Sequence, residues 1–419
     1  MANPLIYTLV AIFGSSSWLS INSVWLELSL LAQALPEGWS LPSYLTLTIQ
    51  LACVAPLIYT LLLKCANVTV SAPPLIFILM LICTAAEFLL AFFWDQTFEV
   101  FGNKHSVVLM ILLFVMAMVN ATSNVLFMPY MAAFHPNYLT AYFVGMGLSS
   151  LVPSIVSLLQ GTSQYTCIYN DVTKSKEPLF TPARFQVRDY TLVMGVWMAV
   201  TLVAFCVLHV LHDRLRDLTK NQAEQESSPL RGERAEKPVQ NDLDENRGGF
   251  GRYCILLACL AFVCAQMNAI VPSIQIYATL SYSQLAYHLA LALSSLSHPV
   301  ASFLPMWIQP RRLKSLLILT LAATVFCGII VLLALQSPTP IGHNTVIGSV
   351  FTVVISIVTA FLHAYLRTVL TTVLREDAPE NESRLFWCGL FMQVGSFLGS
   401  GLMFPLVNVV KLFKDASFC

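Results

Sequence analysis

The sequence has few charged residues: Asp, Glu, Lys and Arg make up 11% of its 419 positions. Soluble globular domains carry roughly 25% charged residues, so this composition argues against a soluble protein. Hydrophobic residues make up 57% of the chain, and the mean hydropathy is +0.72. A chain of this length accommodates about a dozen spans of ~20 residues together with their loops. We therefore interpret it as an integral membrane protein whose main surroundings are the lipid bilayer.

Several functional signatures are also missing. The net charge is zero, and no basic patch indicates nucleic-acid binding. The sequence contains no Walker A pattern, which argues against ATP as an energy source, and no Ser-His-Asp or HExxH arrangement of an enzyme. Of the 11 cysteines, most lie in apolar runs, and none forms a CxxC pair or a Cys/His pair with metal-ligand spacing. We expect neither a cofactor nor a metal site; protein partners stay unknown.

Hydrophobic runs dominate what is present, and they predict an all-α polytopic membrane protein. Each candidate run is long enough to cross a bilayer of ~30 Å. The eleven expected transmembrane helices, in a 6+5 arrangement, cover residues 5–30, 42–63, 73–94, 106–128, 138–160, 190–211, 253–277, 282–308, 313–335, 345–372 and 384–410.

One segment departs from this composition. Residues 213–250 hold 16 of the 44 charges and show no apolar periodicity, a pattern typical of a chain that does not fold alone. We expect an N-terminal six-helix bundle over 1–212, a flexible cytoplasmic linker over 213–252 and a C-terminal five-helix bundle over 253–419. With the N-terminus inside, 15 of the 22 Lys and Arg residues fall on the cytoplasmic side, and the C-terminus lies outside.

Polar side chains form stripes inside several predicted spans. Trp18, Asn22, Trp25 and Ser29 share one face of the first span at helical spacing. Further stripes, some of them next to prolines, contain Asn120, Ser123, Asn124 and Phe127; Asn268 and Gln275; Tyr287, His288, Ser295 and His298; Ser356, Thr359, His363 and Arg367; Gln393 and Ser396. Each stripe is open to two interpretations: hydrogen bonds between helices, worth about 0.6 kcal/mol per pair, or a central pathway for a solute.

The spans are nearly free of ionisable groups apart from Glu27, Glu87 and Arg367. A proton pump would use a chain of acidic residues, which is missing here. The residues therefore favour facilitated diffusion of a neutral, aromatic, hydrogen-bonding solute. Glu27 lies off the Trp18 face, and we expect it to pair with a neighbouring helix.

Six segments of the chain form a long and specific pattern: residues 22–28 (NSVWLEL), 35–44 (LPEGWSLPSY), 121–125 (ATSNV), 285–290 (LAYHLA), 385–389 (LFWCG) and 403–408 (MFPLVN). In these segments the chain resembles the vertebrate riboflavin transporter family, solute carrier family 52. The likeness covers nearly all predicted spans in order and fails only in the linker and the 161–189 loop.

This resemblance implies an architecture like the equilibrative nucleoside transporters, in the broad major-facilitator style. It also implies sodium-independent uptake of riboflavin at the plasma membrane. An isoalloxazine ring stacks on Trp or Phe, its dione edge pairs with amides, and its ribityl hydroxyls need small polar partners. We expect the substrate pocket to contain Asn22, Trp25, Asn124, Phe127, Gln275, Tyr287, His288 and Gln393.

The chain departs from the family at one outer loop. Family members carry a cysteine there, whereas residues 337–340 read SPTP. In the expected topology, Cys167 and Cys419 both lie outside, and either a disulfide between them or two free thiols fits the sequence. Two further functions stay open: transport of nucleosides or another flat heterocycle, and a receptor that binds a ligand without moving it.

Overall fold

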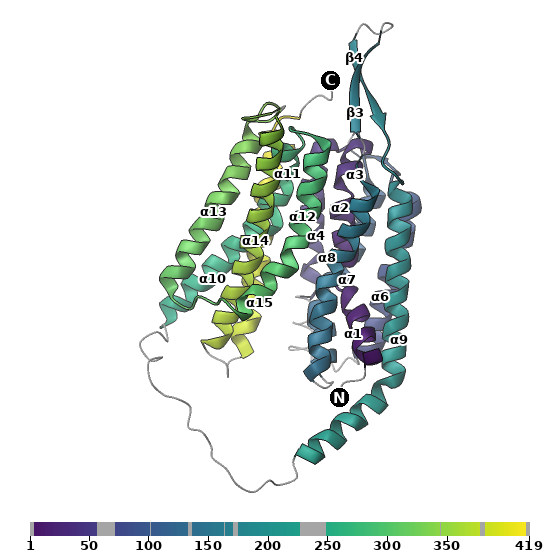
Figure 1. The fold of residues 1–419 in the computed structure, drawn as a ribbon, viewed down its shortest axis with the longest axis vertical. Helices are drawn as coiled ribbons and strands as arrows, with labels where there is room; N and C mark the ends of the chain where they lie inside the picture. The colour runs from purple at the N-terminus through teal and green to yellow at the C-terminus, as the bar shows by residue number, and fades with distance from the viewer. Residues whose placement is uncertain are drawn as a thin grey trace.

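The computed structural model describes residues 4–56, 72–100, 102–132, 136–162, 164–170, 175–226, 249–343, 345–377 and 382–415. Its N-terminal half, residues 4–226, and its C-terminal half, residues 249–415, lie side by side (Figure 1). The N-terminal half consists of α1 Pro4–Ser15, α2 Leu19–Leu26, α3 Leu28–Ala34, η1 Gly38–Ser40, α4 Leu41–Ala52, α6 Ala72–Phe93, β1 Phe98–Val100, β2 Asn103–His105, α7 Val107–Ala132, α8 Pro136–Gln160, β3 Gln164–Asn170, β4 Ser175–Thr181 and α9 Val187–Glu226. The C-terminal half consists of α10 Phe250–Ala265, η2 Gln266–Ile270, α11 Val271–Thr279, α12 Gln284–Phe303, η3 Leu304–Met306, α13 Leu313–Leu335, α14 Val346–Glu376 and α15 Glu382–Asn408.

The apolar runs form helices, as predicted. Judged by helix length and hydropathy, however, fewer helices than the expected eleven qualify as membrane spans. Within the described residues, eight helices are long and apolar enough to cross a membrane, or nine if the bent pair α1–α2 forms one span. α4 ends at Ala52 after 12 residues, and the apolar part of α7, Val107–Ser123, is shorter than the 18 residues that a span requires, so neither passes. The fold is therefore an all-helical membrane bundle, and the count of eleven stays a prediction.

The first span is broken by a run of serines. α1 and α2 meet at an angle of 54°. Between them, the hydroxyls of Ser15 and Ser16 donate to the carbonyls of Ile12 and Phe13, both at 2.7 Å. Serine hydroxyls that bond to the preceding turn compete with the helical backbone and bend helices. The bend therefore follows from the local sequence.

The segment expected to be a flexible linker begins as a helix. α9 continues to Glu226, well past the predicted end of the sixth span at residue 211. Residues 213–226 are rich in Leu, Arg, Lys, Gln and Glu, which all have high helix propensity. The charged residues thus make this part too polar for a membrane span, but it is still helical.

The two ends of the bundle differ. The antiparallel hairpin β3–β4 and the end of α15 lie at one end, which we call the hairpin end (Figure 1). The N-terminus and the far end of α9 lie at the other, which we call the linker end (Figure 1). The hairpin β1–β2 pairs Phe98 with His105 in a second antiparallel register.

The hydrophobic core is shared by the two halves at the hairpin end only. One buried cluster contains Leu41 and Leu45 of α4 together with Ile274 of α11. The other two clusters, toward the linker end, each belong to one half: one surrounds Phe13 and the other surrounds Leu366. Among the described residues, the halves are thus joined by apolar packing at the hairpin end and have separate cores toward the linker end.

Within each half, glycines allow one pair of helices to pack backbone to backbone. A side chain at Gly145 of α8 would collide with the carbonyl of Ala11 in α1, and one at Gly395 of α15 with the carbonyl of Ala261 in α10. Small residues at such positions are typical of helix contacts in membranes, where close approach supplies the packing energy. α1–α8 and α10–α15 are therefore corresponding structural pairs in the two halves.

This contact predicts the effect of one methyl group. Gly395→Ala should lower the free energy of unfolding by about 1–3 kcal/mol because the new Cβ overpacks the α10–α15 contact. Gly401→Ala in the same helix is the matched control, because nothing lies within 4 Å of its new Cβ. Thermal melting of the purified protein, followed by tryptophan fluorescence, measures both. Equal melting temperatures for the two variants would contradict the assigned helix contact.

Candidate solute pathway

A polar stripe on α4 crosses from one half to the other. Ser43, Thr46 and Gln50 are spaced at i, i+3 and i+7, so they share one face of the helix, and each is at most 5% exposed. Their partners belong to the C-terminal half, on α11 and α15. Asn408 Nδ2 donates to Ser43 Oγ at 2.8 Å, the Thr46 and Ser273 hydroxyls are 3.1 Å apart, and Gln393 Nε2 donates to Gln50 Oε1 at 2.8 Å. We call this interface between the halves the seam.

A second polar contact crosses the seam from α12. His288 is 2% exposed, and its Nδ1 lies 3.5 Å from Ser29 Oγ of α3. Ser295 follows His288 at i+7 on the same side of α12 and is half-buried. Further along α12, Pro299 lies against Gly147 of α8: a Cβ atom on residue 147 would be 3.6 Å from Pro299 Cβ. This face of α12 thus becomes more accessible from the hairpin end toward the linker end.

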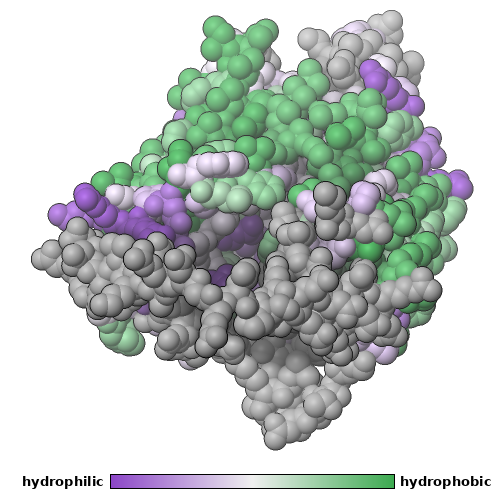
Figure 2. Space-filling view, turned by 60° about the horizontal axis from the view of Figure 1, so that its bottom comes forward, coloured by the Kyte–Doolittle hydropathy of each residue, from purple (hydrophilic) through white to green (hydrophobic). Residues whose placement is uncertain are grey.

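The surface at the linker end is hollowed. Seen from this side, hydrophilic residues are visible at the floor of the hollow, next to a hydrophobic surface (Figure 2). The two halves thus share a core at the hairpin end and have separate cores toward the linker end, where this hollow lies.

Other polar groups are satisfied inside a single half. In the C-terminal half, the two ring nitrogens of His363 lie 2.7 Å from the carbonyl oxygen of Thr359 and 2.8 Å from Gln266 Oε1. Gln266 Nε2 in turn donates to Thr324 Oγ1 at 3.1 Å. Gln266 opens η2, a π-helical turn, and such turns frequently mark functional sites. His363 therefore connects α14 with η2 and, through Gln266, with α13, all within the C-terminal half.

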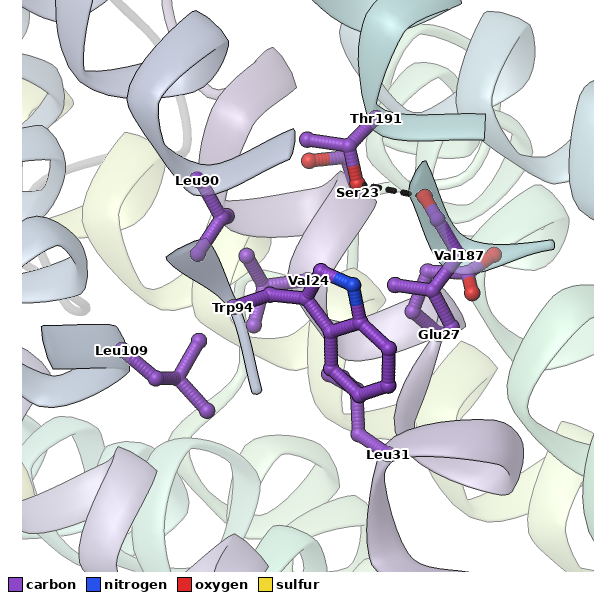
Figure 3. A pocket seen from close by; sticks show the side chains of 9 residues that line it. All are labelled: Ser23, Val24, Glu27, Leu31, Leu90, Trp94, Leu109, Val187 and Thr191. Atoms are coloured by element: carbon purple, nitrogen blue, oxygen red, sulfur yellow. Dashed lines mark hydrogen bonds between the residues drawn. The ribbon is translucent and has the colours of Figure 1, made fainter. Parts of the chain in front are cut away.

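The buried acid Glu27 also belongs to one half. Gln160 Nε2 of α8 donates to Glu27 Oε2 at 3.4 Å, as the sequence-based expectation of a neighbouring helix partner requires. Glu27 lines a void of about 10 Å³ together with Ser23, Trp94 and Thr191 (Figure 3). This volume holds about one water molecule and no heterocycle. The void is therefore excluded as a substrate pocket.

A larger recess, of about 710 Å³, lies at the hairpin end beside α4 and α7. Its walls include Leu51, Ile111 and Phe114, whose side chains are among the exposed apolar ones that cover a lipid-facing surface. Tyr44 and Phe404 pack edge to face in it with ring centroids 5.0 Å apart. The recess opens sideways, so the seam is the better candidate for a pathway between the halves.

Comparison with known proteins identifies the family. The profile of the solute carrier family 52 riboflavin transporters matches residues 2–415. The chain is 44% identical to "Riboflavin transporter rft-1" of Caenorhabditis elegans, over 99% of this chain and 98% of that one. It is 35% identical to "Solute carrier family 52, riboflavin transporter, member 3" of Homo sapiens, again over 99% and 98%. The chain belongs to the solute carrier family 52 riboflavin transporters.

Solved structures show which fold this family 52 chain has. It superposes on an auto-inhibited POT family peptide transporter with a TM-score of 0.58 at 12% identity, covering 97% of this chain and 90% of the other. The nucleoside transporter NupG gives a TM-score of 0.53 at 12% identity, covering 99% and 92%. At these identities the likeness establishes a transporter fold of the major-facilitator type and nothing about the substrate.

In this family 52 chain, four of the eight residues expected in the pocket lie on the helices that form the seam. Gln393 donates a hydrogen bond across the seam, and His288 contacts Ser29 across it. Tyr287 belongs to the core cluster that both halves share, and so does Ile274, the residue before Gln275. Gln275 itself is 8% exposed.

The other four lie in the N-terminal half. Asn22 Nδ2 donates to the carbonyl of Ser149 at 3.1 Å, and Trp25 packs partly buried against the shared cluster. Phe127 is 1% exposed and packs on Phe13 with ring centroids 5.0 Å apart. Asn124 lies on α7 one turn before Phe127. The eight residues thus form two groups.

The sequence analysis missed the stripe on α4. Ser43, Thr46 and Gln50 carry the same i, i+3, i+7 signal as the stripes that were recognised, and three hydrogen bonds across the seam depend on them. Of the two cysteines considered for a disulfide, Cys167 lies on β3, and Cys419 lies outside the described residues. The disulfide stays a prediction.

The Gln50–Gln393 pair allows a double-mutant cycle. Gln50→Ala and Gln393→Ala should each lower uptake roughly tenfold, because each leaves the other amide without its partner; Gln50 is buried and Gln393 half-buried, which places the cost toward the lower end of about 1–3 kcal/mol. If the pair only joins the two halves, the double variant loses no more than either single variant. If Gln393 also contacts the solute, its single variant loses more than Gln50→Ala.

The cycle is measured as initial uptake rate per transporter at the cell surface. Val394→Ala is the matched control because Val394 is the next residue on α15 and is 43% exposed. Additive losses in the double variant would show that the two amides act independently and would contradict the assigned bond.

Proposed function

We propose that this chain mediates sodium-independent, facilitative uptake of riboflavin across the plasma membrane by alternating access. The observation that carries the proposal is the family match over residues 2–415, combined with a bundle whose halves share a hydrophobic core at the hairpin end and have separate cores toward the linker end. The relatives named as riboflavin transporters are matched over 98% of their own length.

The polar groups of the seam suit this substrate. Riboflavin is neutral and flat, and it carries amide-like edges and several hydroxyls. Asn, Gln, Ser and Thr side chains offer both donors and acceptors for such groups without charge. The ion pairs of the described residues, by contrast, lie at the ends of the bundle, for example between Arg252 and Asp377. A pathway lined by uncharged groups does not need a counter-ion.

We propose that the substrate contacts Asn22, Trp25, Asn124, Phe127, Gln275, Tyr287, His288 and Gln393 over the transport cycle. In the state described here, Phe127 is packed on Phe13 and Gln393 is bonded to Gln50. Contact with riboflavin therefore requires that both residues exchange these partners as the halves move. The expected six- and five-helix bundles on either side of the charged segment would be the two moving bodies.

The proposed topology places the linker end in the cytoplasm and the hairpin end outside, with the N-terminus inside and the C-terminus outside. The distribution of Lys and Arg supports it, above all the short basic loop 310–314 between α12 and α13. In this orientation, the end at which the two halves have separate cores would face the cytoplasm.

Substrate identity is tested by uptake into proteoliposomes. Labelled riboflavin should accumulate until the internal and external concentrations are equal, and an excess of nucleosides should leave the rate unchanged. Competition by nucleosides would favour the alternative of a broader heterocycle transporter. Saturable binding without uptake would favour a receptor. Empty liposomes carried through the same steps provide the background.

If transport is passive, as proposed, uptake should not depend on external sodium. Replacing external sodium by choline should leave the initial rate of riboflavin uptake nearly unchanged, because no acidic relay or nucleotide motif supplies a coupling site in the spans. A strict sodium requirement would overturn the facilitative part of the proposal and leave the substrate untouched.

A further inference from the structure

A file of three aromatic rings bridges the seam at the hairpin end. Tyr277 of α11 is 2% exposed and packs against both Trp39 of η1 and Phe413, which follows α15. The ring centroids are 5.6 Å apart for Trp39 and Tyr277, and 5.4 Å apart for Tyr277 and Phe413. Because Trp39 belongs to the N-terminal half and the other two to the C-terminal half, Tyr277 carries the contact between the halves.

The chain reverses direction after α15 to deliver Phe413 to this position. The amide of Leu412 donates to the carbonyl of Leu406 at 3.0 Å, and Lys411 between them adopts a left-handed backbone with φ 52°. This conformation is unfavourable for residues with a side chain and is typical of a helix C-terminal turn. As a result, Phe413 is buried at 6% exposure, while its neighbour Leu412 is 45% exposed.

The segment after α15 is anchored beside Tyr277. The hydroxyl of Ser337, in the α13–α14 connection, donates to the carbonyl of Lys414. Ser337 Oγ in turn accepts from the hydroxyl of Ser281, which lies 3.0 Å away and follows Tyr277 by four residues. Hydrogen bonds therefore connect the end of α11 that presents Tyr277 to the segment that presents Phe413.

We propose that residues 411–415 form a strap that keeps the hairpin end closed, and that Phe413 is the positioning residue holding Tyr277 against Trp39. Opening this end separates Trp39 from Tyr277. The strap opposes that separation because Phe413 packs on Tyr277 and holds it in place against Trp39. The role of the strap in the transport cycle rests on the proposed function, whereas its effect on closure does not.

Accessibility of the seam tests the strap without measuring transport. A cysteine placed by Ser273→Cys lies on the α4 contact, where Ser273 is fully buried. Adding Phe413→Ala should speed its reaction with a membrane-impermeant maleimide roughly two- to tenfold in intact cells, the factor expected for the loss of one aromatic pair. The same chain without Ser273→Cys gives the background from native thiols.

The controls separate the ring from the segment. Leu412→Ala alters the exposed neighbour and should leave the rate unchanged, and Phe413→Tyr keeps the ring and should do the same. If Phe413→Ala reaches the surface poorly, Phe413→Leu, which is apolar but has no ring, replaces it. An unchanged rate for the ringless variants, or an equal increase for Leu412→Ala, would overturn the strap.

The side of the membrane from which the maleimide reacts tests the strap and the proposed topology separately. If the increase appears in inside-out vesicles instead of intact cells, the strap is supported and the orientation given under the proposed function is wrong. If riboflavin uptake is missing but the increase is present, the substrate assignment fails and the strap stands.

Discussion

The structure depends on one constraint: a polar group inside the bilayer must find its partner within the protein. The chain meets it on α4 by pairing Ser43, Thr46 and Gln50 with side chains of the other half. The hydroxyls of Ser43 and Thr46 also donate to backbone carbonyls one turn back in the chain, so the other half adds a second partner to them, whereas Gln50 accepts from Gln393. In the proposed function, Gln393 would bind the solute as well as Gln50, so the solute and the opposite half would compete for the same amide.

Among the described residues, a shared apolar core joins the two halves at one end of the bundle and not at the other. At the hairpin end, residues of α4 and α11 belong to one core, whereas toward the linker end each half keeps its own. Within each half, glycine contacts such as Gly145 against Ala11 bring helix backbones together. Interactions inside a half are therefore close and backbone-based, while those between halves use side-chain ends. This difference allows the halves to separate without losing their own structure.

Composition and apolar periodicity predicted the helical membrane fold and the position of most helices, because burial in lipid demands long apolar runs. They did not predict the bend between α1 and α2, although the serine run that causes it is visible in the sequence. For the site, spacing identified polar faces but not their partners. His288 and His363 look alike in sequence, yet one contacts Ser29 across the seam and the other bonds to Gln266 within one half. Which face meets which is a property of tertiary packing, and a single sequence carries little information about it.

The chemistry of the seam also bears on how easily it opens. Neutral hydrogen bonds between membrane helices contribute about 0.6 kcal/mol each on average, and an aromatic pair adds about 0.5–1.5 kcal/mol. Three such bonds and the contact of Trp39 with Tyr277 therefore total a few kcal/mol, a sum that thermal fluctuation and a bound solute can offset. A buried ion pair broken at the same place would leave an uncompensated charge and cost about 3–5 kcal/mol by itself. A seam built from amides, hydroxyls and rings is thus suited to opening without an external energy source, which is what facilitative transport of a neutral molecule requires.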